Sequence, residues 1–258
     1  MLTFRNTSIA FVFLFIGLVI IHYSVFSIHY SVFILLILAY KAMIIYGCSY
    51  IGSGYFLQAI CKANNSQHEI AITFDDGPDK SITPEILNLL QENQVKATFF
   101  CIGRKVEKEK ELLKTIDEQG HLVGNHSYSH APFFDFYSTD KVRKELILTN
   151  GFIKEAISKE PLLFRPPYGV TNPNIASAVN ALGLTTIGWS VRSLDGVSKN
   201  EAEILKRVTK NLKSGDIILF HDTSETSLNV LKKFLVFTKQ NNFKIVSLDK
   251  LLNINAYA

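Results

Sequence analysis

Two adjacent carboxylates and two histidines four residues apart are the groups in this chain best suited to metal-dependent chemistry. Asp75 adjoins Asp76, and the spacing of His126 and His130 would bring both imidazoles to one side of a helical turn. One carboxylate and two imidazoles form a common divalent-metal site with open positions for water and substrate. The second carboxylate is then free to accept a proton. We therefore expect a hydrolytic metal centre here, rather than the ordinary tight turn that Asp-Asp-Gly-Pro also favours.

Further polar residues occupy equivalent places along the chain. Arg165, Asp195 and His221 each stand at or beyond the C-terminal end of a short apolar run, as Asp75 and His126 do. In a βα barrel the C-terminal ends of all strands gather on one face, where catalytic groups are mounted. The pattern therefore predicts a single site built from several strand ends.

The elements that must position these groups alternate from residue 68 onward. The predicted strands are 69–74, 97–102, 122–124, 163–164, 185–188, 216–220 and 244–246. The predicted helices are 83–92, 107–119, 138–158, 174–182, 199–212 and 227–240. Strands alternating with helices indicate an α/β fold with a mostly parallel sheet. About seven βα units predict a barrel, somewhat short of the usual eight.

Four motifs carry a family resemblance. They are TFDDGP at 73–78, HSYSH at 126–130, RPPYG at 165–169 and LFH at 219–221. In this order they resemble the signature motifs of the polysaccharide deacetylases, the NodB-homology enzymes of carbohydrate esterase family 4. The resemblance implies a distorted (β/α) barrel and metal-dependent removal of N-acetyl groups from amino sugars.

The resemblance also implies roles for the residues of the metal site. Asp75 would be the general base, while Asp76, His126 and His130 would hold zinc or a similar divalent ion. Arg165 would orient Asp75.

The remaining motif residues would complete the site around the substrate. His221 would be the general acid, the backbone N–H of Tyr168 would help to bind the oxyanion, and Leu219 would line the acetate pocket. Asp195 matches a supporting aspartate and would support Arg165 or His221. The chain departs from the family at Gly196, where the pattern has tryptophan, so the wall of the acyl pocket differs.

The N-terminal part has a different composition. Residues 1–61 contain Arg5 and Lys41 but no acidic residue, and the 35 residues from 6 to 40 are uncharged apart from histidine. That length is too great for one upright span or for the apolar core of a signal peptide, and nearly enough for two spans. We predict a membrane anchor over 1–61 with two transmembrane helices, a linker over 62–67 and a catalytic domain over 68–258.

An internal repeat lies inside the apolar stretch. IHYSVF occurs at 21–26 and again at 28–33, seven residues later. On one continuous helix His22 and His29 would share a face and could pair around a metal or proton. We instead predict an interfacial turn between two spans, where Tyr and His are common.

Charge and cysteine content exclude other classes of function. The chain has 27 basic and 23 acidic residues, a balance that excludes a strongly basic nucleic-acid footprint. Cys48, Cys61 and Cys101 have no CxxC spacing and give no disulfide framework.

Arg5 and Lys41, at the outer ends of two spans, favour a cytoplasmic catalytic domain. Because the resembling family works mostly on envelope glycans, we nevertheless expect the domain outside the cytoplasm.

The function expected from the sequence is a membrane-anchored hydrolase that removes N-acetyl groups from an envelope or cell-wall glycan. One alternative is deacetylation of a lipid-linked or nucleotide-linked amino sugar at the cytoplasmic leaflet. Another is a non-catalytic glycan-binding membrane protein, which predicts loss of the base or of a metal ligand. A non-haem iron oxygenase would use the same ligand set, but the alternation of strands and helices argues against it.

Overall fold

A parallel sheet forms the centre of the fold in the computed structural model, which describes residues 2–64 and 67–258. Its strands are β1 (Glu69–Asp75), β2 (Thr98–Cys101), β3 (Leu122–Asn125), β4 (Leu163–Phe164), β5 (Thr185–Thr186), β6 (Val191–Arg192), β7 (Ile217–His221) and β8 (Lys244–Ile245). Seven follow the order β5-β4-β3-β2-β1-β7-β6, and β8 pairs with the start of β1. Within the described ranges no ladder joins β5 to β6. The sheet is therefore an open, distorted barrel, and the predicted α/β fold is confirmed.

Helices alternate with these strands along the chain. In the catalytic region they are α3 (Thr83–Glu92), α4 (Gly103–Val106), α5 (Lys110–Glu118), α6 (Thr139–Ile157), α7 (Pro173–Ala181), α8 (Glu201–Thr209), α9 (Glu225–Gln240) and α10 (Leu248–Leu252). Short 3-10 turns are η1 (Ile51–Ser53), η2 (Phe134–Phe136) and η3 (Pro167–Gly169). The helix predicted over 107–119 is α5, while α4, α10 and strand β6 were not predicted.

The central strand is buried on both faces. Every residue of β1 except Glu69 is buried, as expected for a parallel strand covered by helices on both sides. Ile70, Ile72 and Phe74 pack into the main hydrophobic cluster together with Phe220 of β7. This packing fixes the heights at which the strands end, and therefore the positions of the polar residues found there.

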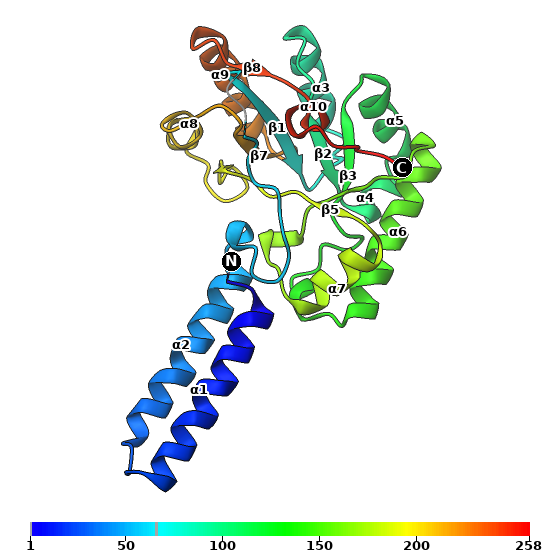
Figure 1. Ribbon diagram of the computed structural model, residues 1–258. Helices are drawn as coiled ribbons and strands as arrows, with labels where there is room; N and C mark the ends of the chain where they lie inside the picture. The colour runs from blue at the N-terminus through cyan, green and yellow to red at the C-terminus, as the bar shows by residue number, and fades with distance from the viewer. Residues whose placement is uncertain (1, 65–66) are drawn as a thin grey trace.

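Two apolar helices project from the catalytic region (Figure 1). They are α1 (Phe4–Ser24, 21 residues) and α2 (Tyr30–Ser49, 20 residues). At 1.5 Å per residue each is about 30 Å long, which matches the hydrocarbon core of a bilayer. Only 6% of the apolar window of each helix is buried, so neither is a core helix of a soluble domain. The two N-terminal helices that the composition predicts are therefore present.

The sequence repeat spans the connection between these helices. His22 lies near the end of α1, and its Nδ1 accepts a hydrogen bond from the backbone N–H of Ile28. His29 is the N-cap of α2. The two histidines therefore lie on either side of the predicted turn between two helices, and they do not share one helix face.

The sequence analysis expected Lys41 at the outer end of a span, and this prediction was wrong. Lys41 lies within α2, eight residues before the last residue, Ser49. Its side chain is exposed, and a long aliphatic stem can carry such a charge toward the membrane surface.

The segment after α2 packs on the catalytic region. Tyr55 and Leu57 are buried, and Lys62 forms an ion pair with Asp216 at 2.8 Å. Residues 65 and 66 of the predicted linker lie outside the described residues. The boundaries of the three predicted segments remain predictions.

Candidate active site

β1 and β7 end side by side, and their register pairs Asp75 with His221. Residues paired in neighbouring parallel strands point their side chains to the same face of the sheet. Both residues are the last of their strands, although the sequence analysis placed them just after strands 69–74 and 216–220. Each strand ends one residue later than predicted, so the backbone ladder itself positions Asp75 and His221.

Three donor atoms meet beside this pair. Asp76 Oδ1 lies 3.4 Å from His126 Nε2 and 3.3 Å from His130 Nε2, and the ligand atoms of all three residues lie within 4.8 Å of one another. Asp76 Oδ1 is buried and has no hydrogen-bond partner among the described residues. A buried carboxylate oxygen that lacks a donor and faces two imidazole nitrogens fits a divalent cation. The three predicted ligands are therefore together and suited to a metal.

The two histidines lie on an irregular loop after β3, not on the helical turn that their spacing suggested. Ser127 and His130 have φ of 62° and 46°, which a regular helix does not contain. Glu145 of α6 holds the loop, because one of its oxygens accepts hydrogen bonds from the backbone N–H of Tyr128 (3.1 Å) and of Ser129 (2.7 Å). The same oxygen accepts from the Ser129 hydroxyl at 2.9 Å. The imidazoles converge because of this loop conformation.

The second nitrogen of His126 is also engaged. Its Nδ1 lies 2.8 Å from the backbone carbonyl of Arg165. A carbonyl can only accept, so Nδ1 carries a proton, and Nε2 is the nitrogen directed toward Asp76. This is the arrangement in which a histidine ligates a metal, with the outer nitrogen fixing the orientation of the ring.

The local charges keep two of the ligands in their metal-binding forms. Burial opposes ionisation of Asp76, but the charges of His126, His130 and His221 hold the pKa of Asp76 well below its usual range. Burial and the charge of His126 lower the pKa of His130 to about 4. At neutral pH Asp76 is an anion and His130 is a neutral imidazole, the forms that metals bind.

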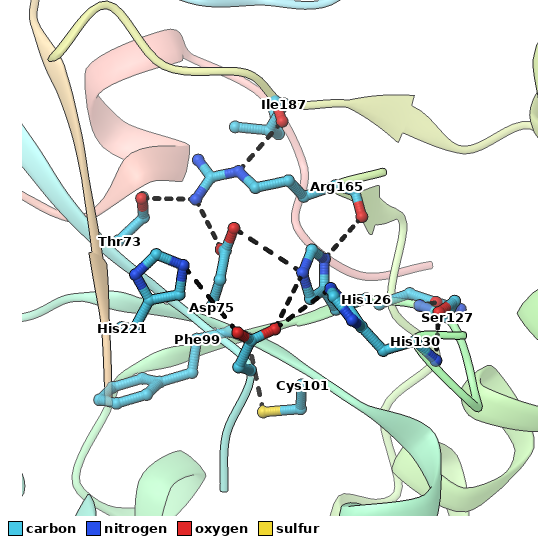
Figure 2. Close-up of polar contacts among 12 residues, drawn as sticks. Thr73, Asp75, Phe99, Cys101, His126, Ser127, His130, Arg165, Ile187 and His221 are labelled. Carbon is cyan, nitrogen blue, oxygen red and sulfur yellow. Dashed lines mark hydrogen bonds and ion pairs between the residues drawn. The ribbon is translucent and has the colours of Figure 1, made fainter. Parts of the chain in front are cut away.

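Arg165 is fully buried and fixes Asp75 (Figure 2). Its Nη1 donates to Asp75 Oδ1 at 2.8 Å and to the Thr73 hydroxyl at 2.7 Å. Its other nitrogens donate to the backbone carbonyls of Ile187 and Gly188. Asp75 Oδ2 is left facing the metal ligands, 3.8 Å from His126 Nε2. One carboxylate oxygen is thus anchored, and the other is directed into the site.

His221 is held by Asp195. His221 Nδ1 lies 2.7 Å from Asp195 Oδ1, and the backbone N–H of His221 donates to Asp195 Oδ2 at 2.9 Å. The Ser193 hydroxyl donates to Asp195 Oδ1 at 2.6 Å. Of the two partners considered for Asp195, the structure therefore gives it His221. The opposite nitrogen, Nε2, faces the site and lies 3.9 Å from Asp76 Oδ2.

The protonation of His221 follows from these contacts. Burial alone would lower its pKa, but the hydrogen bond and charge of Asp195, with the charges of Asp75 and Asp76, outweigh burial and raise the pKa to about 9. His221 therefore carries a proton at neutral pH and is suited to donate it.

These side chains open into a cavity of about 210 Å³. Tyr168 and Leu219 also line it, and the Tyr168 ring packs edge-on against His130 with ring centroids 4.7 Å apart. Trp189 forms another part of the wall. At Gly196, where the family pattern has tryptophan, a Cβ atom would lie 3.3 Å from the His221 ring. The cavity wall next to His221 is therefore backbone rather than an indole.

Sequence reasoning assigned no role to several residues that support the site. Thr73 lies two residues before Asp75 on the same face of β1, a position that strand periodicity could have indicated. Asp222 directly follows His221, and burial raises its pKa to about 7. Its Oδ2 accepts a hydrogen bond from the Thr83 hydroxyl at 2.6 Å, which connects β7 to α3. Glu145 had no sequence signal, because its role depends on how α6 packs against the loop.

Known proteins resemble the chain over this whole region. The polysaccharide deacetylase family matches residues 62–187. A peptidoglycan-N-acetylglucosamine deacetylase of Bacillus cereus is 36% identical over 193 residues, covering 73% of this chain and 90% of that protein. The peptidoglycan-N-acetylglucosamine deacetylase PgdA of Listeria monocytogenes is 35% identical over 202 residues, covering 78% of this chain but 42% of the longer relative.

A solved structure agrees with the sequence relatives. The crystal structure of the Bc1960 peptidoglycan N-acetylglucosamine deacetylase has 32% sequence identity and a TM-score of 0.72, covering 78% of this chain and 95% of that one. The resemblance seen in the four motifs is thus confirmed along most of the sequence and in the fold. The chain belongs to the polysaccharide deacetylase family, whose members are carbon–nitrogen hydrolases.

Proposed function

We propose that the chain is a membrane-anchored, metal-dependent deacetylase that removes N-acetyl groups from the amino sugars of a cell-wall glycan. The observation that carries this proposal is the arrangement around one cavity of a metal-ligand triad, an anchored carboxylate and a protonated histidine. Amide hydrolysis requires these three parts: a Lewis acid, a base for the attacking water and an acid for the leaving amine. The names of the relatives support N-acetylglucosamine of peptidoglycan as the substrate.

Zinc is the metal that we propose for the triad of Asp76, His126 and His130. Two imidazoles and one carboxylate are a ligand set that zinc enzymes use, with the remaining positions open. When bound, the ion would polarise the amide carbonyl and lower the pKa of a water molecule.

Asp75 is the proposed general base. Its Oδ2 points toward the triad, while Arg165 holds Oδ1 in a charge-assisted hydrogen bond. In the first step Asp75 takes a proton from the attacking water, whose oxygen adds to the amide carbon. The backbone N–H of Tyr168 is the proposed donor to the oxyanion that forms, and the left-handed conformation of this residue (φ 61°) sets the direction of that group.

His221 is the proposed general acid. It gives the proton at Nε2 to the amine nitrogen as the carbon–nitrogen bond breaks, and Asp195 stabilises the charged ring before that transfer. Leu219 is the proposed contact for the acetyl methyl group. The products are acetate and a free amino sugar.

Metal content and acetate release, measured together, test this proposal. We expect Asp76→Ala, His126→Ala and His130→Ala each to lose both bound metal and acetate release from N-acetylglucosamine oligomers. Each substitution removes one of three protein ligands, so the ion is no longer held. His68→Ala is the matched control, because His68 is exposed and takes no part in the triad. Full metal occupancy together with retained activity in any of the three variants would contradict the assignment.

The proposed location of the catalytic domain is outside the cytoplasm. Its support is the peptidoglycan named for the relatives, which lies beyond the cytoplasmic membrane. The two apolar helices would hold the domain against that membrane.

A further inference from the structure

The end of α2 is hydrogen-bonded to the segment that forms the rim of the cavity. The backbone N–H of Thr171 donates to the carbonyl of Cys48, and its hydroxyl donates to the carbonyl of Gly47, both at 3.1 Å. Thr171 follows Tyr168 by three residues, and Tyr168 lines the cavity and packs on His130. Three residues of chain span at most about 11 Å, so the rim lies within that distance of Thr171.

The last turn of α2 has the features of a membrane–water boundary. Tyr46 and Tyr50 are both exposed there, with ring centroids 5.6 Å apart. Arg5 lies at the same end of the hairpin, because the backbone N–H of Phe4 donates to the carbonyl of Tyr55 in the segment that follows α2. Tyrosine and arginine at the end of an apolar span are typical of the interfacial layer. The contact with Thr171 therefore sets the cavity rim close to the level of that layer.

Two exposed phenylalanines lie beside the same segment. Phe133 and Phe136 are 69% and 80% exposed, and their rings are in edge-to-face contact at 6.3 Å. The loop that carries them is tied to the rim segment, because the Asn172 side chain donates to the carbonyl of Asp135 at 2.6 Å. Among the described phenylalanines of the catalytic region, these two alone are exposed. Exposed aromatic pairs of this kind mark surfaces that contact a protein or a membrane.

The contacts of the loop favour a membrane over a protein partner. The loop is joined through Asn172 and Thr171 to the end of an apolar helix, so it is continuous with the membrane-facing part of the chain. Val197 adds another exposed apolar side chain on the wall of the cavity. In Figure 1 the arrow of β1, whose tip carries the site, points toward the end of the domain from which α1 and α2 emerge.

We propose that Phe133 and Phe136 insert into the membrane surface and that the site takes an amino sugar carried on a membrane lipid. This inference rests on the deacetylase function proposed above and names the substrate class for the same site. Water cleaves the N-acetyl carbon–nitrogen bond to give acetate and the free amine, while the bond between sugar and lipid is untouched. The lipid chain stays in the bilayer beside the hairpin, and its sugar reaches the cavity without leaving the interfacial layer.

The experiment compares two substrates for the full-length protein in phosphatidylethanolamine–phosphatidylglycerol vesicles. One is N-acetylglucosamine linked through diphosphate to a polyprenyl chain in the same vesicles, and the other is a soluble N-acetylglucosamine oligomer. We expect kcat/KM for the lipid-linked sugar to exceed that for the oligomer at least tenfold. Phe133→Ser combined with Phe136→Ser should lower this ratio at least tenfold, because serine does not partition into the interface.

Two further variants keep the outcome interpretable. Phe136→Trp should retain the ratio, since tryptophan also favours the membrane interface. Val236→Ser, an exposed apolar position on α9, should leave the ratio unchanged. Equal kcat/KM values for the two substrates, or an equal loss on both in the double serine variant, would overturn the inference and leave the deacetylase intact. Failure of the metal-loaded protein to release acetate from either substrate would instead refute the deacetylase, and this inference with it.

Discussion

Asp75 and His221 leave neighbouring strands at the same level, and each depends on a second charged residue for its state. Arg165 engages one oxygen of Asp75, and Asp195 engages one nitrogen of His221. The proposed base, Asp75, and the proposed acid, His221, are therefore oriented by separate charged residues. This separation allows substitutions that alter one proton transfer while leaving the metal ligands in place.

Asp75→Asn should keep the metal but lose most turnover. The amide has nearly the same shape as the carboxylate but cannot accept the proton of the attacking water. General acid–base groups contribute about 10²- to 10⁴-fold, so we expect a fall in kcat of that size with unchanged metal content. A fall of less than about threefold would show that another group is the base.

Asp195→Asn should shift the basic limb of the pH–rate profile to lower pH. The active form of His221 is the protonated one, so activity is lost as pH rises through its pKa of about 9. Without the charge of Asp195 that pKa falls, and deprotonation begins at lower pH. The profile of kcat between pH 6 and 10 measures this shift. An unmoved basic limb would mean that Asp195 does not control the proton on His221.

At the scale of elements, α6 holds the metal loop. Glu145→Ala should weaken metal binding about 10- to 100-fold, the usual effect of losing a residue that orients metal ligands. The reason is that two backbone N–H groups between the histidines lose their acceptor. Competition with a chelator gives the affinity. Glu155→Ala on the same helix is the control, because Glu155 pairs with Lys110 at the surface, away from the metal loop. Equal affinities in the two variants would refute the role of Glu145.

The alternation of strands and helices could be predicted from the sequence because most strands are short apolar runs and most helices are amphipathic. It failed where the signal was too short: β6 has two residues, one of them exposed. The sequence also predicted which residues form the metal site, but it did not predict the backbone conformation that brings them together. Asp76, His130 and Tyr168 all have positive φ, conformations that non-glycine residues adopt only when surrounding packing requires them. Such conformations depend on contacts between distant segments, so local sequence does not encode them.

For the whole molecule, two helices that both cross the membrane, as proposed, would put Arg5 and the catalytic domain on the same side of it. We expect a reporter fused after Gln67 to be active only outside the cytoplasm, where the proposed glycan lies. Arg5 and Lys62 flank the hairpin on its domain side and favour the opposite orientation. The measurement uses two reporter fusions, one active only inside the cytoplasm and the other active only outside it. Activity of the cytoplasmic reporter alone would move the substrate to the inner leaflet and leave the chemistry of the site unchanged.

The close packing of Gly47 against Tyr55 has a consequence for the distance from the membrane at which the site can act. A Cβ at Gly47 would lie 2.2 Å from the Tyr55 ring, so α2 and the segment that joins it to the catalytic region approach too closely for a side chain between them. An enzyme on a flexible tether can reach substrates over a wide range of distances from its anchor. Under the proposed function, a domain seated directly on its helices would act at one fixed height above the membrane, on sugars that lie next to the bilayer.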